Sequence, residues 1–481
     1  MRSNHRQARV QIIVALAVWA IGSFPQPSDA QWVQEDKITV VGGMPGDALG
    51  RHAALSGGVL IATAPMAEGP PAPRAYLFQV ADGLQLHELT IEVEEEFEEL
   101  HSVDIDGHHA VLGTVVDPDS AVNGAVYVFD VMEGQELARI THRDVAGLMP
   151  YSDFGVDLDL AEESLVVGAP FDAEGRTGAA YVFDATGRMV HRLTVPEAEC
   201  DDRVGFSVAA DRGIALIGAP HDDDACPANP DCESGAAYVF DLASGLLLLK
   251  LTASDVAPGD RFGWDVAMSG RIGIVGATGN DEMGSNSGAV YAFDLVTGEQ
   301  LFKLTANDGA EGDRFGTGVA MSGSVAVIQA RFKTYIFDVV SRIQLFGIEE
   351  SLSYDSFDID GDRVIVGASD VDDLRGAIYV FERTCFDLTG DASVGPADLA
   401  GLLEAWGPCE ACPADVTRDG TVDFGDLLGL LSWWGPCPQP GACCLPGGTC
   451  VPAKMTGGLD CVEQSGTYQG DDSVCDDVRC E

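Results

Sequence analysis

The motif Tyr-x-Phe occurs seven times along this chain of 481 residues, at intervals of 44 to 57 residues. A period of this length, with room for several short strands, is typical of repeat architectures, in which each repeat is one supersecondary unit. The repeat therefore constrains the fold more than any other feature of the sequence. The seven tyrosines are Tyr76, Tyr127, Tyr181, Tyr238, Tyr291, Tyr335 and Tyr379.

The clearest copy, residues 259–306, divides into four strand-like pieces separated by glycine turns, because glycine accepts a positive φ without steric cost. The pieces are residues 262–268, which alternate apolar and polar side chains, the apolar run 272–277, the aromatic segment 289–293 and the final segment 300–305. Four strands per repeat are typical of a β-propeller blade. Seven copies predict a mainly β fold built as a seven-bladed β-propeller.

The seventh copy stops at Phe381 without a fourth strand. Residues 37–40, Lys-Ile-Thr-Val, are similar to the fourth-strand segments 250–253 and 303–306. We therefore expect the N-terminal strand to pair into the last blade. Such a joint would remove the unpaired edges that an open array exposes.

The order Phe-Gly, Gly-Ala-Pro and Tyr-x-Phe, as at residues 154–155, 168–170 and 181–183, resembles the FG-GAP repeat over residues 37–384. The resemblance implies a propeller like the head of integrin α chains, with a role in binding or adhesion. Integrin-type repeats often carry a calcium loop between the Phe-Gly and Gly-Ala-Pro strands. Here that place holds short turns.

Two of these turns, residues 104–107 and 358–361, look like cation loops but align with plain turns in the other copies. We interpret their Asp and Gly residues as turn formers. The acidic loop Asp222-Asp223-Asp224 is a better candidate ion site within the propeller, and a solvated loop is the alternative.

The first thirty residues are typical of a secretory signal peptide, with three arginines, an apolar run at 10–21 and a small-residue cleavage site at 28–30. The chain is therefore expected to be secreted or displayed on the extracellular surface, with no transmembrane segment in the mature protein. The formal net charge of −50 excludes nucleic acid as a partner, because both surfaces would repel each other.

Thirteen cysteines in an exported chain imply disulfides. Cys226 and Cys232 could staple one propeller loop, which would leave Cys200 unpaired. Four cysteines lie between Cys385 and Cys437 and six in the tail that follows, and their pairing stays open. The tail has too little apolar core to fold without such staples.

Two acidic twelve-residue loops follow the propeller, at residues 387–398 and 415–426, each before a helix-like apolar stripe and a Trp-Gly-Pro-Cys motif. Calcium needs six to eight oxygen ligands, which a tight loop can present from alternate positions. We expect Ca²⁺ as cofactor, bound more weakly by the first loop because Ala392 replaces the glycine of the central bend. The predicted ligands are Asp387, Thr389, Asp391, Ser393 and Asp398 in the first loop, and Asp415, Thr417, Asp419, Thr421, Asp423 and Asp426 in the second.

This duplicated half EF-hand resembles a type I dockerin over residues 385–438. The resemblance implies calcium binding and docking to a cohesin-like protein, although the loop-end residues 396–397 and 424–425 and the cysteines are atypical. The expected domains are a signal peptide at 1–30, the propeller at 31–384, the dockerin-like module at 385–438 and the cysteine-rich tail at 439–481.

The sequence contains no Gly-x-Ser-x-Gly elbow, no His-Glu-x-x-His helix and no phosphate-binding loop. The leading hypothesis is therefore a non-catalytic binding or adhesion protein whose propeller face binds a protein or a glycan. One alternative is an extracellular polysaccharide-degrading enzyme or its dockerin-bearing substrate-binding subunit. A second alternative is a structural envelope protein.

Overall fold

The computed structural model describes most of residues 32–383 and several short segments beyond them. Within 32–383 the residues not described are 41–42, 66–73, 92–97, 117–123, 142–143, 146, 150–151, 162–163, 174–175, 225–231, 332 and 350–354. Beyond residue 383 the described residues are 393–408, 421–422, 427, 435–436, 442–445, 449–452 and 467–468. The predicted signal peptide lies outside them.

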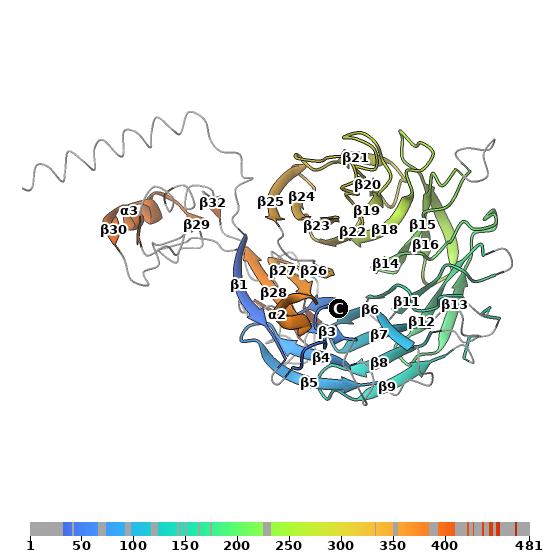
Figure 1. Cartoon of the computed structure of the whole chain (residues 1–481), viewed down its shortest axis with the longest axis horizontal. Helices are drawn as coiled ribbons and strands as arrows, with labels where there is room; N and C mark the ends of the chain where they lie inside the picture. The colour runs from blue at the N-terminus through green and yellow to red at the C-terminus, as the bar shows by residue number, and fades with distance from the viewer. Residues whose placement is uncertain are drawn as a thin grey trace, which may run out of the picture. The chain divides into compact units, whose positions relative to one another are not determined.

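Residues 32–383 form seven four-stranded antiparallel sheets, seen as a ring in Figure 1, and the predicted seven-bladed β-propeller is confirmed. The first six blades are β2 (Ala53–Ser56), β3 (Val59–Ala64), β4 (Arg74–Gln79), β5 (Leu84–Thr90); β6 (Glu98–Asp106), β7 (His109–Val116), β8 (Val126–Asp130), β9 (Glu136–Ile140); β10 (Leu158–Ala161), β11 (Ser164–Ala169), β12 (Ala179–Asp184), β13 (Met189–Leu193); β14 (Val208–Asp211), β15 (Ile214–Ala219), β16 (Ala236–Asp241), β17 (Leu246–Leu251); β18 (Phe262–Ser269), β19 (Ile272–Ala277), β20 (Ala289–Asp294), β21 (Gln300–Leu304); and β22 (Gly318–Ser322), β23 (Val325–Ala330), β24 (Lys333–Asp338), β25 (Ile343–Glu349).

The seventh blade joins the two ends of the propeller. It contains β26 (Ser356–Asp360), β27 (Arg363–Ala368), β28 (Ala377–Arg383) and, as its outermost strand, β1 (Trp32–Ile38), with the short helix α2 (Val371–Leu374) between β27 and β28. β1 pairs antiparallel with β28, and Lys37 lies opposite Tyr379. The predicted closure is confirmed, and it buries Trp32 and Ile38.

The blades pack through the aromatic strand, because its alternate side chains point into the spaces between sheets. Tyr291 and Phe293 of β20 are fully buried, and Phe262 meets both rings edge to face at 5.6 and 5.7 Å. The same arrangement links Phe315 with Tyr335 and Phe337 in the next blade. The repeated Phe-Gly and Tyr-x-Phe motifs are thus two halves of one packing unit.

The glycine of the Gly-Ala motif is required by the neighbouring blade. A Cβ added at Gly276 would collide with the carbonyl oxygen of Gly316, which belongs to the Phe-Gly motif of the next blade. The second and seventh blades lack the glycine of the Phe-Gly motif, and they follow the two blades that lack the glycine of the Gly-Ala motif, where Thr63 and Gln329 stand instead. The two glycines are therefore lost together. Where the next blade has no Phe-Gly glycine whose carbonyl approaches closely, the Gly-Ala position can carry a side chain.

Beyond the propeller, residues 384–438 belong to a second compact unit, described here by itself. It contains β29 (Ser393–Val394), α3 (Pro396–Glu404), β30 (Gly407–Pro408), β31 (Thr421–Val422) and β32 (Gly435–Pro436). The tail contains β33 (Ala442–Leu445), β34 (Thr449–Pro452) and β35 (Thr467–Tyr468), paired in one small sheet. The helix expected after the first acidic loop begins within that loop, at Pro396, because proline fits the first helical position.

The cysteine expectations are tested only in part. Cys200 is an exposed free thiol, whereas Cys232 forms a disulfide. Cys226, its expected partner, lies outside the described residues. No helix among the described residues is long and apolar enough to cross a membrane.

Candidate functional site

The two faces of the propeller differ in their connections. Because the strands of a blade alternate in direction, the turns after its first and third strands share one face, here called the turn face. The turn between first and second strands has two residues in every blade. The opposite face, here called the loop face, carries connections from two residues (331–332) to sixteen (220–235) and seventeen (141–157).

A cavity of about 460 Å³ is lined by the first strands of all seven blades. Its lining includes six carboxylates, five of which are here called the channel carboxylates, together with His52, His101 and the rings of Phe206, Trp264 and Phe357. The channel carboxylates are Asp104, Asp157, Asp159, Asp265 and Asp358. The described lining contains no lysine or arginine, so no fixed cation neutralises them there.

Each channel carboxylate links its own blade to the next one. The amide of Leu55 donates to Asp358 at 2.7 Å, that of Val208 to Asp157 at 2.7 Å and that of Val319 to Asp265 at 2.6 Å. The amides of Leu160 and Ala210 donate in the same way to Asp104 and Asp159. These amides lie on the first strand of a blade, which has no strand partner on its inner edge, so the carboxylates satisfy donors that would otherwise be unpaired.

The pKa values of these carboxyl groups reflect that environment. Burial raises the pKa of Asp157 and of Asp358 to about 7, and the hydrogen bonds from backbone amides oppose the shift without cancelling it. Burial also raises the pKa of Asp104 well above its usual range, and the charge of Asp159 adds to this effect. The hydrogen bond between the two side chains further raises the pKa of Asp104 and opposes the rise that burial causes in the pKa of Asp159.

The interpretation of residues 104–107 and 358–361 as turn formers is right for the glycines and wrong for Asp104, Asp358 and Asp360, the last of which accepts the amide of Gly57 in the next blade at 2.8 Å. Gly107 and Gly361 make the turns, at φ of 55° and 58°. Asp104 and Asp358 instead lie within β6 and β26 and accept amides of the next blade. The alternation of polar residues along the first strand, as at Asp157 and Asp159, was the signal that could have identified them.

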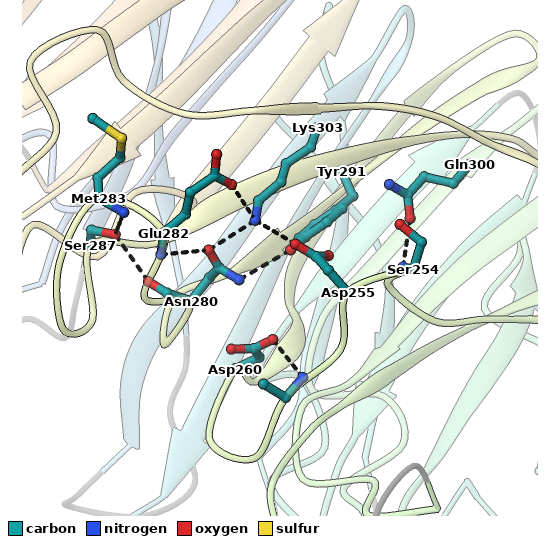
Figure 2. Close-up of polar contacts among 11 residues, drawn as sticks. Ser254, Asp255, Asp260, Asn280, Glu282, Met283, Ser287, Tyr291, Gln300 and Lys303 are labelled. Carbon is teal, nitrogen blue, oxygen red and sulfur yellow. Dashed lines mark hydrogen bonds and ion pairs between the residues drawn. The ribbon is translucent and has the colours of Figure 1, made fainter.

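A second polar arrangement lies near the loop face in the third to seventh blades, and Figure 2 shows it in the fifth. Lys303 contacts Asp255 at 2.7 Å, Glu282 at 2.6 Å and the amide oxygen of Asn280 at 3.0 Å. The ammonium also lies over the ring of Tyr291, 5.2 Å from its centroid. We call this combination of tyrosine, cation and carboxylate a tyrosine network.

The network recurs because its parts occupy equivalent positions: the tyrosine of the third strand, a cation opposite it or beside it, and an acidic loop residue. In the fourth blade Tyr238 donates to Asp222 at 2.5 Å, and Lys250 contacts Asp222 at 2.8 Å. In the seventh blade the cation is Lys37 of β1, 2.7 Å from Asp372. Related networks are Tyr181, Arg192 and Asp172 in the third blade and Tyr335, Lys333 and Asp308 in the sixth.

The structure gives Asp222 a role different from ion binding. Its carboxylate is buried and holds Tyr238 and Lys250, and Asp224 contacts the same ammonium at 2.6 Å. The positive charge beside Asp222, for which the sequence suggested a metal ion, thus comes from the side chain of Lys250. Among the described residues, no group of three or more His, Cys, Asp or Glu side chains is placed to hold a metal ion.

Only three of the eleven predicted calcium ligands are described. Asp398 is buried at the start of α3, and it accepts the amide of Gly395 at 2.7 Å. Ser393 pairs with Pro436, and Thr421 pairs with Pro408. These two pairings are related by the 28-residue duplication, which gives the unit an internal two-fold relation. The ligands outside the described residues are Asp387, Thr389, Asp391, Asp415, Thr417, Asp419, Asp423 and Asp426.

Comparison with known proteins supports the repeat. A family model described as FG-GAP repeat matches residues 188–240, 248–293 and 299–335, which cover parts of the third to sixth blades. No curated protein matches the chain. The match agrees with the FG-GAP resemblance and with the propeller.

Proposed function

We propose that this FG-GAP propeller is a secreted or surface-displayed, non-catalytic binding protein that recognises a protein or glycan on its loop face. The observation that carries the proposal is the contrast between the two faces. The turn face carries two residues after the first strand of every blade and four or five after the third strand of the first six blades, whereas loop-face connections range from two residues to seventeen. Variable loops on a rigid scaffold are where binding residues concentrate.

The rigidity of the scaffold supports this reading. The tyrosine networks hold the bases of several loop-face connections, as Lys303 does by contacting both Asp255 and Glu282 from two different loops. Pre-ordered loops lose less conformational entropy on binding, and this raises affinity without additional contacts. Figure 2 shows both loops converging on the one ammonium.

The C-terminal unit is proposed to bind Ca²⁺ and to dock or anchor the chain. The two loops offer only oxygen donors, which suit a hard cation. The equivalent pairings of Ser393 with Pro436 and of Thr421 with Pro408 would place the two loops back to back. Bound calcium would neutralise the clustered carboxylates and fix the loops for a cohesin-like partner. Calorimetric titration of the full chain should show calcium binding that Asp415→Ala weakens, whereas Asp281→Ala, on an exposed propeller loop, should leave it unchanged.

The loop-face proposal is tested with the full chain against a panel of neutral and anionic polysaccharides and purified surface proteins. Met283 is 43% exposed on a loop-face connection, and Val340 is 69% exposed on the turn face. Met283→Asp should weaken binding to whichever ligand the panel identifies, and Val340→Asp should not. Binding to no member of the panel, or loss of binding in the Val340 variant alone, would refute the proposal.

One observation favours the hydrolytic alternative. Asp104 and Asp159 form a hydrogen-bonded pair of carboxyl groups inside a cavity, and burial raises the pKa of both, as in sites of acid–base catalysis. Their hydrogen bonds to Leu160 and Ala210 give them a structural role that needs no substrate. Release of reducing ends from a polysaccharide by the wild type, abolished by Asp159→Asn in a chain that still melts cooperatively, would favour the enzyme over the binding protein.

A further inference from the structure

Arginines gather on the loop face of a chain whose net charge is −50. Arg203, Arg261 and Arg314 occupy equivalent positions in three successive blades, each just ahead of the first strand. Arg176 lies on the long connection of the preceding blade. We call these four residues the arginine arc.

The arc residues have an unusual backbone. Their φ angles are 60° for Arg176, 59° for Arg203, 55° for Arg261 and 53° for Arg314, all in the left-handed region. Glycine or asparagine would adopt this conformation at lower cost. The equivalent Ala48 and Asp153 of the first and third blades have the same conformation, at φ of 56° and 52°, so the repeat imposes it on Arg203, Arg261 and Arg314 whatever the side chain.

Aromatic rings orient several of these guanidinium groups. Arg176 and Arg203 both lie over Phe171, at 5.2 and 5.0 Å from its centroid. Arg261 lies 5.9 Å from the centroid of Trp264, which packs against Phe206 at 5.1 Å. A guanidinium stacked on a ring keeps its N–H edge free for an oxygen ligand.

The acidic neighbours use only part of the donor capacity of the arc. Arg203 contacts Asp201 at 3.3 Å, a long ion pair near the surface, and exposed pairs of this kind are weak. Arg261 is held by Glu233 at 2.7 Å, and its side chain is still 39% exposed. Arg314 is exposed and makes no ion pair within the described part of the chain. Each guanidinium carries five donors, so the arc retains capacity for further acceptors.

We propose that the arginine arc, with Phe206 and Trp264 beside it, binds an anionic glycan through its carboxylate or sulfate groups. The inference rests on the loop-face binding function proposed above and names the ligand class. Guanidinium forks match carboxylate and sulfate oxygens in pairs, and the rings give apolar surface against which sugar faces can pack. Cations repeated from blade to blade fit a polymer with repeated charges better than a folded partner.

The net charge of the chain does not exclude this ligand. At physiological ionic strength the screening length is about 8 Å, so carboxylates elsewhere on the propeller act weakly at the arc. Asp153, Asp201 and Glu233 lie close to the arc and oppose an anion, so the affinity depends on contacts with the guanidinium groups that outweigh this repulsion. His221, 3.5 Å from Glu233, has its pKa lowered by burial and by the charge of Arg203, so it adds no positive charge near neutral pH.

The test measures binding of the full chain to polygalacturonate, which carries carboxylates, and to dextran sulfate, with neutral dextran and polyglutamate as comparisons. Arg203→Gln combined with Arg314→Gln should weaken binding of the anionic glycan by roughly tenfold or more. The matched control is Arg212→Gln combined with Arg271→Gln, which removes the same charge from two exposed side chains on the turn face. Arg203→Lys should give an intermediate loss, because lysine keeps the charge and loses the fork.

The outcomes separate this inference from the proposed function. Selective binding of polygalacturonate or of dextran sulfate, lost only in the arc variant, supports the inference and identifies the anionic group. Binding of neutral dextran or polyglutamate alone, or equal losses in both double variants, overturns the inference and leaves the loop-face function standing. Failure to bind any glycan or protein overturns both. Arg314→Gln alone should weaken binding without lowering the melting temperature, because Arg314 has no ion pair to lose among the described residues.

Discussion

The channel carboxylates and two carboxylates of the tyrosine networks, Asp255 and Asp308, are the same chemical group in two regions of one propeller, and their pKa values shift in opposite directions. Burial raises the pKa of Asp157 and Asp358 to about 7. By contrast, the hydrogen bond from Lys333 lowers the pKa of Asp308. Burial also acts to raise the pKa of Asp255, but hydrogen bonds from Lys303 and Tyr291 outweigh it and lower the pKa.

The difference comes from the partner. A backbone amide donates one hydrogen bond and brings no net charge, so the channel carboxylates are hydrogen-bonded and still poorly compensated. An ammonium group brings a full positive charge along with its hydrogen bond. The channel carboxylates therefore connect neighbouring blades, at an electrostatic cost, whereas the tyrosine networks stabilise single blades and their loops.

The largest effect is expected from removing the strand that joins the ends of the ring. Deleting residues 32–38 takes away the fourth strand of the seventh blade, the burial of Trp32 and Ile38, and the cation of one tyrosine network. The melting temperature should fall by roughly 10 °C or more, because two large apolar side chains and a row of strand hydrogen bonds are lost. Lys37→Met is the control, since it removes the cation and keeps the strand. Unchanged melting of the deletion would contradict the closure.

The next effect is the pH dependence that two channel carboxylates contribute to stability. The pKa of Asp157 and Asp358 is higher in the folded chain than the ordinary 3.8. The stability that these two groups contribute is therefore fully present below about pH 4 and is lost as the pH rises through about 7.

Asp157→Asn combined with Asp358→Asn should remove that dependence. The difference in unfolding free energy between variant and wild type should grow in favour of the variant from pH 4 to pH 8, by on the order of 2 kcal/mol per site. Chemical denaturation at a series of pH values measures it. If the difference in unfolding free energy between variant and wild type stayed constant from pH 4 to pH 8, ionisation of the two channel carboxylates would not destabilise the folded chain.

A smaller effect is expected when one channel carboxylate is truncated. Asp265→Ala leaves the amide of Val319 without its acceptor and should cost about 1–3 kcal/mol. Asp265→Asn keeps an oxygen at that position and should cost less, or stabilise the chain near pH 8, because burial raises the pKa of Asp265 well above its usual range. Equal losses in both variants would argue against the bridge between blades.

The smallest effect is expected in a tyrosine network. Lys303→Met removes the cation shared by Asp255 and Glu282 and should cost about 1 kcal/mol, because the lysine side chain is 17% exposed and its partners are partly solvated. Arg188→Met, whose partner Asp184 lies at the surface, is the control and should leave the melting temperature unchanged. If Lys303→Met lowered the free energy of unfolding more than Asp265→Ala, the tyrosine networks would contribute more to stability than the channel carboxylates.

The sequence was sufficient for the repeat and its closure. The strands expected at 272–277 and 300–305 lie at Ile272–Ala277 and Gln300–Leu304, because short-range alternation and glycine turns determine where a blade's strands begin and end. The match between residues 37–40 and the fourth strands identified the closing strand, since it carries the same lysine opposite the same tyrosine. The calcium loops stay a prediction.

What the sequence determined is thus the local pattern: four strands per repeat, seven repeats and a detached strand that fits the last one. Only the tertiary structure decided which polar residues meet. Asp104 and Leu160 are 56 residues apart, and His52 and His101, stacked at 5.6 Å, come from different blades. The physical reason is that ring closure brings equivalent positions of neighbouring blades together, and no local periodicity encodes whether a given aspartate there meets an amide, a lysine or a second carboxylate.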